Sequence, residues 1–272
     1  MPAINAISSD KLVRLIGTPA CPALIDVGAE PGALIPGALR RSPATVDRWA
    51  GQLAVASAIV ICRDGGDASP GVAAWLRHAG IRAEILEGGF AAWRDAGLPT
   101  VKEAALPPRD EQGRTIWVTR ARPKVDRIAC PWLIRRFADP SAVILFVAPS
   151  EVAGVGEQLG AAPFDMDGVF WSHRGELCTF DVMVDELGLG DIPALRHLAA
   201  IVRGADTARP DIAPQAAGLL AASLGLSRIY ADDLEQLDAG MLIYDAFYRW
   251  CRDAVDETHD WVSHQPKARA RA

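Results

Sequence analysis

The sequence predicts an α/β domain with a parallel sheet, followed by an α+β domain that is mostly helical. Over about the first 100 residues, apolar β-type runs alternate with helical segments, which is typical of a parallel sheet. A polar stretch with prolines and glycines, residues 100–114, then interrupts the pattern. After it, few strands precede many amphipathic helices. The length of 272 residues suits two domains of ordinary size.

The elements of the first block are delimited by ordinary end signals. Ser9 precedes a helix that Gly17 stops, and Pro70 begins another that ends at Gly80. In order, the expected elements are a helix at 10–16, a strand at 23–27, a turn at 33–39, a helix at 45–53, a strand at 58–61, a helix at 70–80, a strand at 82–86 and, through a glycine turn, a last helix reaching Trp93.

The second block has fewer strands. In order, we expect a strand at 115–119, a basic helix, an apolar strand at 142–148, a short helix ending at Gly160, a hairpin at 168–171 and 175–177 around His173, and helices at 179–187, 193–203, 214–224 and 232 to about 259. We therefore predict a first domain over 1–101, a linker over 102–114, a second domain over 115–260 and a basic flexible tail over 261–272.

Composition predicts a folded cytoplasmic protein. Half of the residues are hydrophobic, and the five cysteines are widely spaced without a CxxC pair, which argues against a disulfide framework. A run of about 18 apolar residues is missing, as is a signal peptide, so we expect neither a membrane span nor export. The net charge of -6 and the lack of a helix-turn-helix pattern argue against direct binding to nucleic acid.

One stretch departs from the acidic balance of the chain. Residues 117–137 read WVTRARPKVDRIACPWLIRRF and contain six basic residues beside a single acid, Asp126. A locally cationic stretch in an anionic chain indicates a local anionic partner. The alternative is a solvated basic face next to a core helix.

This basic stretch also carries a family resemblance. The runs RPKVDRIACPWLIRRF, FWSH at 170–173, CTFD at 178–181, IVRGAD at 201–206 and YDAFY at 244–248 resemble the chromate-resistance protein family. The resemblance spans residues 116 to 256. It implies a bacterial cytoplasmic protein linked to chromate sensing or to defence against chromate and oxidative stress.

A second resemblance covers about residues 8–101. LIDV at 24–27, IPGAL at 35–39, VICRDGG at 60–66 and LEGGFAAWRDAGLP at 86–99 resemble a rhodanese-like domain. The resemblance implies that Cys62 holds the position of the catalytic cysteine that carries a persulfide. The alternative for Cys62 is a buried structural cysteine at a strand end.

The residues after Cys62 agree with such a site. They form a loop that leads into a helix, so backbone N–H groups at Arg63, Gly65, Gly66 and Ser69 are candidates to bind an anion and to stabilise a thiolate.

Several positions depart from the rhodanese pattern. Gly28 and Leu34 replace an arginine and a histidine that are common there, and the loop is one residue longer than usual. Asp64 and Asp67 oppose an anionic substrate, and an arginine near the closing end of the loop is missing.

The basic stretch supplies a second candidate site. Arg120 ends the predicted strand and Arg127 begins the helix, so both guanidinium groups should face one side of the turn at Pro123, where His173 can join them. We predict a pocket for a small tetrahedral oxyanion. For His173, the alternative is a surface position on a hairpin.

A metal site is the weaker alternative, so our prediction is no metal and no cofactor. The set considered is His173, Cys178, Asp181, Asp206 and Asp245, and His-x4-Cys is not a usual zinc spacing. Cys130 is open to two interpretations. It is a redox-active N-cap if the helix starts at Pro131, and a buried apolar contact if the helix starts at Asp126.

Two functions follow from these sites. In the first, the chain is a sulfurtransferase in which Cys62 moves sulfur from a donor such as thiosulfate to a thiol acceptor. In the second, the chain is a sensor or regulator that binds an oxyanion, and the first domain is a non-catalytic module. The sequence does not define the physiological substrate or the oligomeric state.

Overall fold

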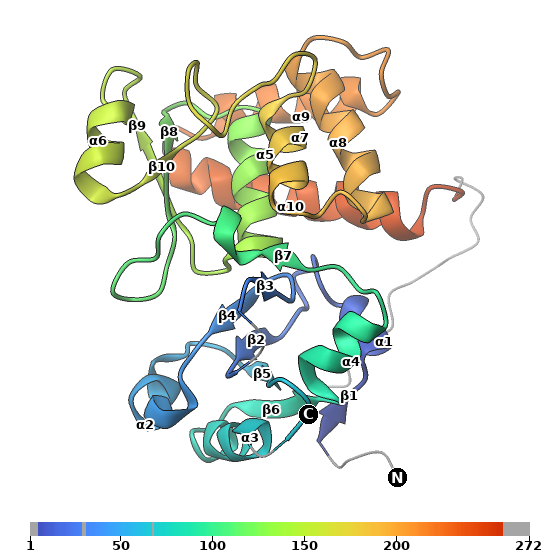
Figure 1. The fold of residues 1–272 in the computed structure, drawn as a ribbon. Coiled ribbons are helices and arrows are strands. Elements are labelled where there is room, and N and C mark those ends of the chain that lie inside the picture. Colours follow the sequence, from blue (N-terminus) through green and yellow to red (C-terminus); the bar gives the residue numbers. More distant parts are fainter. Residues whose placement is uncertain (1–4, 29–30, 67, 258–272) are drawn as a thin grey trace.

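The first domain is a parallel sheet between two layers of helices (Figure 1). The structure is a computed structural model, and it describes residues 5–28, 31–66 and 68–257. Five strands lie in the order β1-β6-β5-β2-β4, and all neighbouring pairs are parallel. The strands are β1 (Ala6–Ile7), β2 (Ala23–Asp26), β4 (Ala38–Arg40), β5 (Ser57–Ile61) and β6 (Arg82–Leu86).

Adjacent residues of the central strands point to opposite faces of this sheet, as a pleated strand requires. Ile25 and Val60 pack with α2 and α3, whereas Leu24 and Ile59 pack with α1 and α4. Both faces are thus apolar and covered, which explains the unbroken apolar runs in the sequence. The helices are α1 (Ser9–Val13), α2 (Val46–Trp49), α3 (Ala68–His78) and α4 (Gly89–Asp95). The predicted α/β class is confirmed.

The turn expected at 33–39 is wrong in part, because two short strands lie within it. β3 (Ala33–Leu34) pairs antiparallel with β7 (Val101–Lys102), and β4 joins the main sheet beside β2. Gly37 makes the bend between them at a φ of +80°. Strands of two or three residues carry little local signal, because partners distant in sequence define them.

The second domain contains a small parallel sheet and a group of helices. Its strands lie in the order β10-β8-β9, which are β10 (Ala162–Pro163), β8 (Ile116–Arg120) and β9 (Val143–Val147). The helices are α5 (Asp126–Leu133), α6 (Val152–Leu159), α7 (Thr179–Glu186), α8 (Pro193–Asp206), α9 (Ala216–Ile229) and α10 (Asp233–Asp253). The α+β, mostly helical class is confirmed for this domain.

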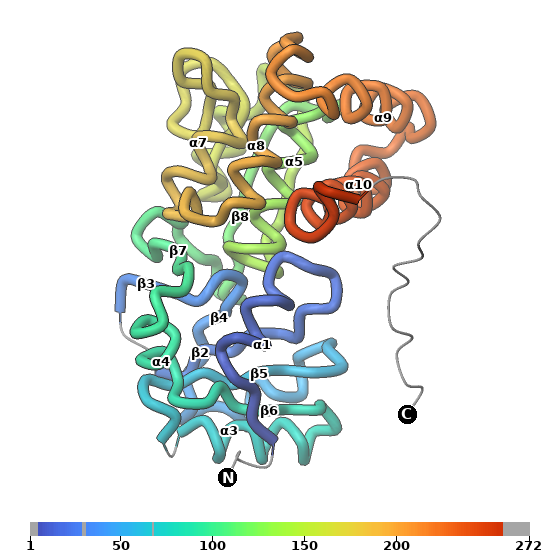
Figure 2. Tube along the Cα trace, turned by 90° about the vertical axis from the view of Figure 1, so that its right-hand side faces the viewer, coloured from blue at the N-terminus to red at the C-terminus, as the bar shows by residue number. Residues whose placement is uncertain are grey.

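Helix α5 lies at the centre, between α7, α8 and α10 (Figures 1 and 2). Its Trp132 is fully buried and packs against Phe180, Tyr244 and Tyr248. The indole N–H donates a 2.8 Å hydrogen bond to Asp245. This aromatic centre fixes the position of α5, and therefore of the residues at its N-terminus.

Two predictions near the candidate site need correction. Helix α5 begins at Asp126, so Cys130 is interior and fully buried, and the N-cap interpretation is wrong. Pro131 offers no N–H to the helix, and a π-helical turn over Ile134–Ala138 follows it. The hairpin around His173 is also wrong, because single bridges at Phe164 and Trp171 and at Arg174 and Leu177 replace it.

The predicted linker, residues 102–114, is packed against both domains (Figure 2). It begins in β7, and Glu103 forms an ion pair with Arg40 of the first domain. Arg109 lies 3.0 Å from the buried Asp139 of the second domain. The domain limits themselves remain a prediction, and the predicted tail at 261–272 lies outside the described residues. Over the described residues, the helices are too short or too polar to cross a membrane.

Candidate functional site

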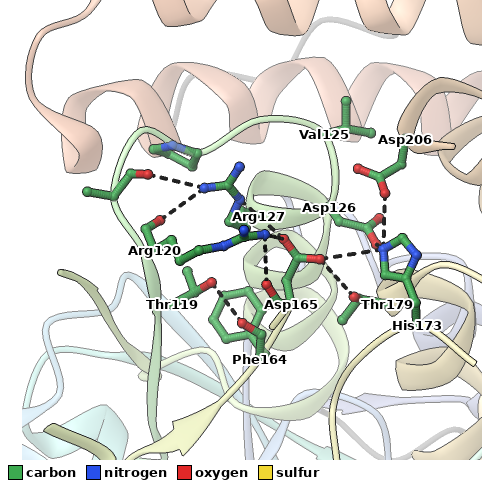
Figure 3. Close-up of polar contacts among 12 residues, drawn as sticks. Thr119, Arg120, Val125, Asp126, Arg127, Phe164, Asp165, His173, Thr179 and Asp206 are labelled. Carbon is green, nitrogen blue, oxygen red and sulfur yellow. Dashed lines mark hydrogen bonds and ion pairs between the residues drawn. The ribbon is translucent and has the colours of Figure 1, made fainter. Parts of the chain in front are cut away.

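Arg120 and Asp165 come together because two parallel strands end at the same edge of a sheet. Arg120 is the last residue of β8, and Asp165 follows β10, which pairs with β8. Polar side chains at the carboxyl ends of parallel strands converge in this way in many α/β binding sites. The Nη2 of Arg120 lies 3.4 Å from Oδ2 of Asp165 (Figure 3).

Arg127 reaches the same carboxylate from the first turn of α5. Its Nε lies 3.2 Å from Oδ2 of Asp165, and its Nη1 donates to the backbone carbonyl of Ala121 at 3.1 Å. On the opposite side, the hydroxyl of Thr179 donates to Oδ1 of Asp165 at 3.0 Å. Asp165 is therefore held from three directions, and it neutralises part of the charge of both arginines.

His173 is surrounded by carboxylates rather than by cations. Its Nε2 lies 3.1 Å from Asp206, 3.5 Å from Asp165 and 3.6 Å from Asp126 (Figure 3). Asp206 is the last residue of α8, and Asp126 is the first residue of α5. The structure thus brings Arg120, Arg127 and His173 together as predicted, but beside three acids.

Asp126 is the most deeply placed of these acids. Its side chain is fully buried, and Oδ2 accepts a 3.3 Å hydrogen bond from the backbone N–H of Phe180 at the start of α7. Among the described residues, no hydrogen-bond partner of ordinary geometry reaches its Oδ1. Such an orphaned carboxylate oxygen is rare in a protein interior and needs a structural or functional reason.

The backbone before Asp126 is strained, and buried side chains hold it. Val125 has a φ of +28°, which is unusual for a β-branched residue. Ser223 accepts a 2.9 Å hydrogen bond from the N–H of Val125, and the hydroxyl of Tyr244 donates to its carbonyl oxygen at 2.9 Å. Gln236 donates to the carbonyl of Pro123. Helices α9 and α10 therefore fix the direction of the Asp126 side chain.

Burial and mutual repulsion make the acids difficult to ionise together. The pKa of Asp126 is raised well above its usual value by burial first, and then by Asp206 and Asp165. The pKa of Asp206 is also raised, again mainly by burial and by Asp165, although the charge of His173 lowers it. Burial lowers the pKa of Arg127, and Asp165 opposes that effect.

The pocket beside this cluster has a volume of about 350 Å³ and is lined by Arg120, Arg127, Asp165, Met166, Asp167, Ser172, His173 and Asp206. The Nε of Arg120 is buried and lacks a hydrogen-bond partner within the described part of the chain. An arginine side chain at the wall of a polar pocket is suited to an acceptor group of a ligand.

Two members of the metal-ligand set considered from the sequence, Asp181 and Asp245, bind other partners in the structure. Asp181 accepts a hydrogen bond from the N–H of Cys178, which caps the N-terminus of α7. It also accepts a hydrogen bond from the guanidinium group of Arg203. Asp245 pairs with Arg136 in the centre of the domain. Sequence reasoning missed Asp126 and Asp165. Asp126 was visible only as the single acid of the basic stretch.

Cys62 lies in the first domain, directly after β5. Its thiol is buried, with 4% of the residue exposed, and the hydroxyl of Ser69 in α3 donates to Sγ at 2.7 Å. The carbonyl oxygen of Gly66 is 3.8 Å from Sγ, and the N–H of Gly66 donates to Asp64. The prediction that this N–H faces the thiol is therefore wrong. Asp67 lies outside the described residues.

A glycine turn supports the loop after Cys62. Gly89 has a φ of +59°, and a Cβ there would come within 2.4 Å of the carbonyl oxygen of Cys62. Gly65 similarly approaches the backbone of Gly88. The glycines of the LEGGF motif therefore permit close backbone packing beneath the loop. Cys130, by contrast, is fully buried, and burial raises the pKa of its thiol well above the usual value.

The second domain is therefore an α+β domain whose polar pocket lies at the carboxyl ends of β8 and β10. Residues 117–251 match the family model of the ChrB C-terminal domain. The chain is 32% identical over 183 residues to Protein ChrB of Cupriavidus metallidurans. The aligned residues cover 63% of this chain and 53% of that protein. It thus spans about half the length of this relative.

Two solved structures are similar to part of this chain. One is a thiosulfate sulfurtransferase from Pseudomonas aeruginosa, with 23% identity and a TM-score of 0.32 over 37% of this chain and 20% of the other. Another is a rhodanese-related protein from Thermoplasma volcanium, with 23% identity and a TM-score of 0.31 over 36% of this chain and 98% of the other.

Proposed function

We propose that this chain acts in chromate resistance as a protein that binds a small inorganic oxyanion in the pocket at Arg120, Arg127 and His173. The observation that carries this function is Arg120 at the wall of a pocket of about 350 Å³, with its side chain 40% exposed and its Nε without a hydrogen-bond partner in the described chain. The pocket lies wholly within the region that matches the family model of the ChrB C-terminal domain.

The chemistry of the wall supports an oxyanion. Arginine presents several N–H donors in one plane, which suits the edge of a tetrahedral anion. Arg120 uses Nη2 on the carboxylate and the carbonyl oxygen of Asp165, and its Nε lacks a hydrogen-bond partner in the described chain. Its side chain is 40% exposed, so an anion can reach it from solvent.

Titration of chromate, sulfate and phosphate into the purified chain tests this function by calorimetry. Arg120→Ala should weaken binding by about one to two orders of magnitude, since a hydrogen bond to a charged group contributes about 1.5–3 kcal/mol. Arg48→Ala, which removes an exposed arginine from α2, is the matched control. Equal affinities in all three proteins, or no binding by the wild type at millimolar anion, would overturn the proposal.

The second candidate function is sulfur transfer at Cys62, and the contact with Ser69 favours it. A hydroxyl that donates to Sγ stabilises a thiolate, which is the nucleophile. The Cys62 thiolate would attack the outer sulfur of thiosulfate, the S–S bond of thiosulfate would break, and sulfite would leave with the electron pair. An acceptor thiolate would then take the outer sulfur and regenerate Cys62.

Mass measurement after treatment with thiosulfate tests sulfur transfer. The wild type should gain the mass of one sulfur atom, Cys62→Ser should gain none, and Ser69→Ala should gain it more slowly. Cys21→Ser, which removes a half-buried cysteine of the same domain, should behave as the wild type. An added sulfur in Cys62→Ser, or none in the wild type, rules out this role for Cys62.

A further inference from the structure

We infer that Asp126, His173 and Asp206 bind a divalent transition-metal ion, whose open coordination positions face the pocket. The inference deepens the proposed function, because it concerns the same pocket and supplies a positive charge to it. Metal binding can nevertheless be measured in the absence of any oxyanion, so the two proposals can fail separately.

The ligand atoms are already grouped. One nitrogen of His173 and one oxygen from each of Asp126 and Asp206 all lie within 4.8 Å of one another. Atoms bonded to a common ion at about 2.1 Å are about 3–4 Å apart, so only small side-chain shifts are needed. The three residues come from the start of α5, the end of α8 and the loop before α7.

An independent observation points to a cation. Asp126 is fully buried, its carboxylate points toward His173, and its Oδ1 is without a hydrogen-bond partner among the residues described (Figure 3). A buried carboxylate oxygen without a donor is costly, and a metal ion supplies the missing partner. The backbone N–H of Phe180 meanwhile holds the carboxylate in this direction.

The charges of the site lead to the same conclusion. Three carboxylates, from Asp126, Asp165 and Asp206, face two guanidinium groups and one imidazole. Without a further cation, this environment opposes an oxyanion. A dication changes the balance, and Arg120 lies on the wall of the same pocket.

Asp165 is better placed as an outer carboxylate than as a ligand. Its Oδ2 lies near both arginines, and its Oδ1 accepts from Thr179 and lies 3.5 Å from His173. Groups in this position orient ligands and tune the metal. A set of three protein ligands leaves positions for water or an anion, as in metal sites that bind substrates.

The donor types restrict the metal. One imidazole and two carboxylates suit Mn²⁺, Fe²⁺, Co²⁺ or Zn²⁺, whereas Mg²⁺ and Ca²⁺ prefer all-oxygen sites. Co²⁺ is the most informative probe, because its visible spectrum reports coordination and a thiolate ligand adds a charge-transfer band. Cys178, buried beside the site, is thereby tested as a competing ligand.

The experiment uses the full chain after chelation and dialysis, titrated with Co²⁺ and, in parallel, with Mn²⁺ and Mg²⁺. The wild type should bind one Co²⁺ without a thiolate band and should prefer Co²⁺ and Mn²⁺ to Mg²⁺. His173→Gln and Asp126→Asn should each weaken Co²⁺ binding at least about 100-fold, since even outer-shell changes cost 10–100-fold.

Matched controls are Asp191→Asn, at an exposed acid of the second domain that does not line the pocket, and His78→Gln, at an exposed histidine of the first domain. Both variants should bind Co²⁺ with the affinity of the wild type. His173→Gln keeps the test decisive if Asp126→Asn does not fold, since the His173 side chain is 40% exposed. No Co²⁺ binding by the wild type, a thiolate band lost in Cys178→Ser, or equal weakening in the controls would overturn the inference.

A final arm separates this inference from the proposed function. Chromate is titrated into chelated and Co²⁺-loaded wild type. Binding only to the loaded protein supports both proposals. Co²⁺ binding without chromate binding in either form overturns the oxyanion function alone, and equal chromate binding in both forms overturns the supporting role of the metal.

Discussion

Asp126 and His173 approach within 3.6 Å of each other, although one begins a buried helix and the other lies in a partly exposed loop. This contact brings a fully buried acid to the wall of a pocket open to solvent. The surrounding framework, rather than local sequence, holds it there, and the following predictions test that framework.

Tyr244 positions Asp126 through the backbone of Val125. Tyr244→Phe would leave the buried carbonyl of Val125 without its 2.9 Å hydrogen bond, which should lower the free energy of unfolding by about 1–3 kcal/mol. If Tyr244 acts on the site, Co²⁺ affinity should also fall about 10-fold. Urea unfolding and Co²⁺ titration measure the two effects. Tyr230→Phe, at a half-buried position, is the control. Lower stability with unchanged affinity would show a purely structural role.

Asp245 stabilises the centre of the second domain. Its carboxylate accepts from Arg136 at two distances of 2.8 Å and from Trp132 at 2.8 Å. Asp245→Ala should lower the free energy of unfolding by about 2–4 kcal/mol, a range reduced because Arg136 is partly exposed and can regain water.

Asp238→Ala on the same helix is the matched control for Asp245→Ala. Asp238 is 76% exposed and lies 3.5 Å from Arg135, so its loss should cost less than about 0.5 kcal/mol. Urea unfolding of the two variants gives the comparison. Similar losses in both would contradict the importance assigned to the buried pair.

Gly89 permits the close packing beneath Cys62. Gly89→Ala and Gly97→Ala both place a side chain at positive φ, which costs about 1 kcal/mol in each case. Only Gly89 would also clash, with the Cys62 carbonyl oxygen at 2.4 Å, whereas open space surrounds a Cβ at Gly97. Gly89→Ala should therefore lose a further 1–3 kcal/mol or so in urea unfolding. Equal losses of unfolding free energy in the two variants would show that the loop after Cys62 shifts to accommodate the added methyl group.

The segment between the domains, residues 102–114, should resist proteolysis near its start and be cut near its end. Glu103 pairs with Arg40 at 3.0 Å and follows β7, whereas Glu111 is exposed in a turn. A glutamate-specific protease should therefore cut after Glu111 well before it cuts after Glu103. Mass analysis of early fragments identifies the order, and prior cleavage after Glu103 would contradict the packing described.

Sequence reasoning located the part of the site that is local. Arg120 and Arg127 flank a strand-to-helix turn within one short stretch, so their proximity follows from adjacent elements. His173 joined them only as an expectation from a hairpin, which the structure replaces with a loop. His173 lines the same pocket as both arginines although its predicted element was wrong, because its tertiary contacts do not depend on a hairpin.

The acids could not be found in this way. Asp165 follows β10, a strand of two residues that only its pairing with β8 defines. Asp126 and Asp206 stand at opposite ends of different helices, and only the packing of α5, α7 and α8 brings them together. Local patterns therefore predicted a cationic pocket, whereas long-range packing adds three carboxylates and changes its chemistry.

Anomalous diffraction from crystals of the full chain soaked with Co²⁺ tests the central claim most directly. The account predicts one strong peak about 2.1 Å from Nε2 of His173 and from carboxylate oxygens of Asp126 and Asp206. A structure in which Co²⁺ occupies only surface carboxylates or cysteine sulfur, with no peak among these three residues, would contradict it.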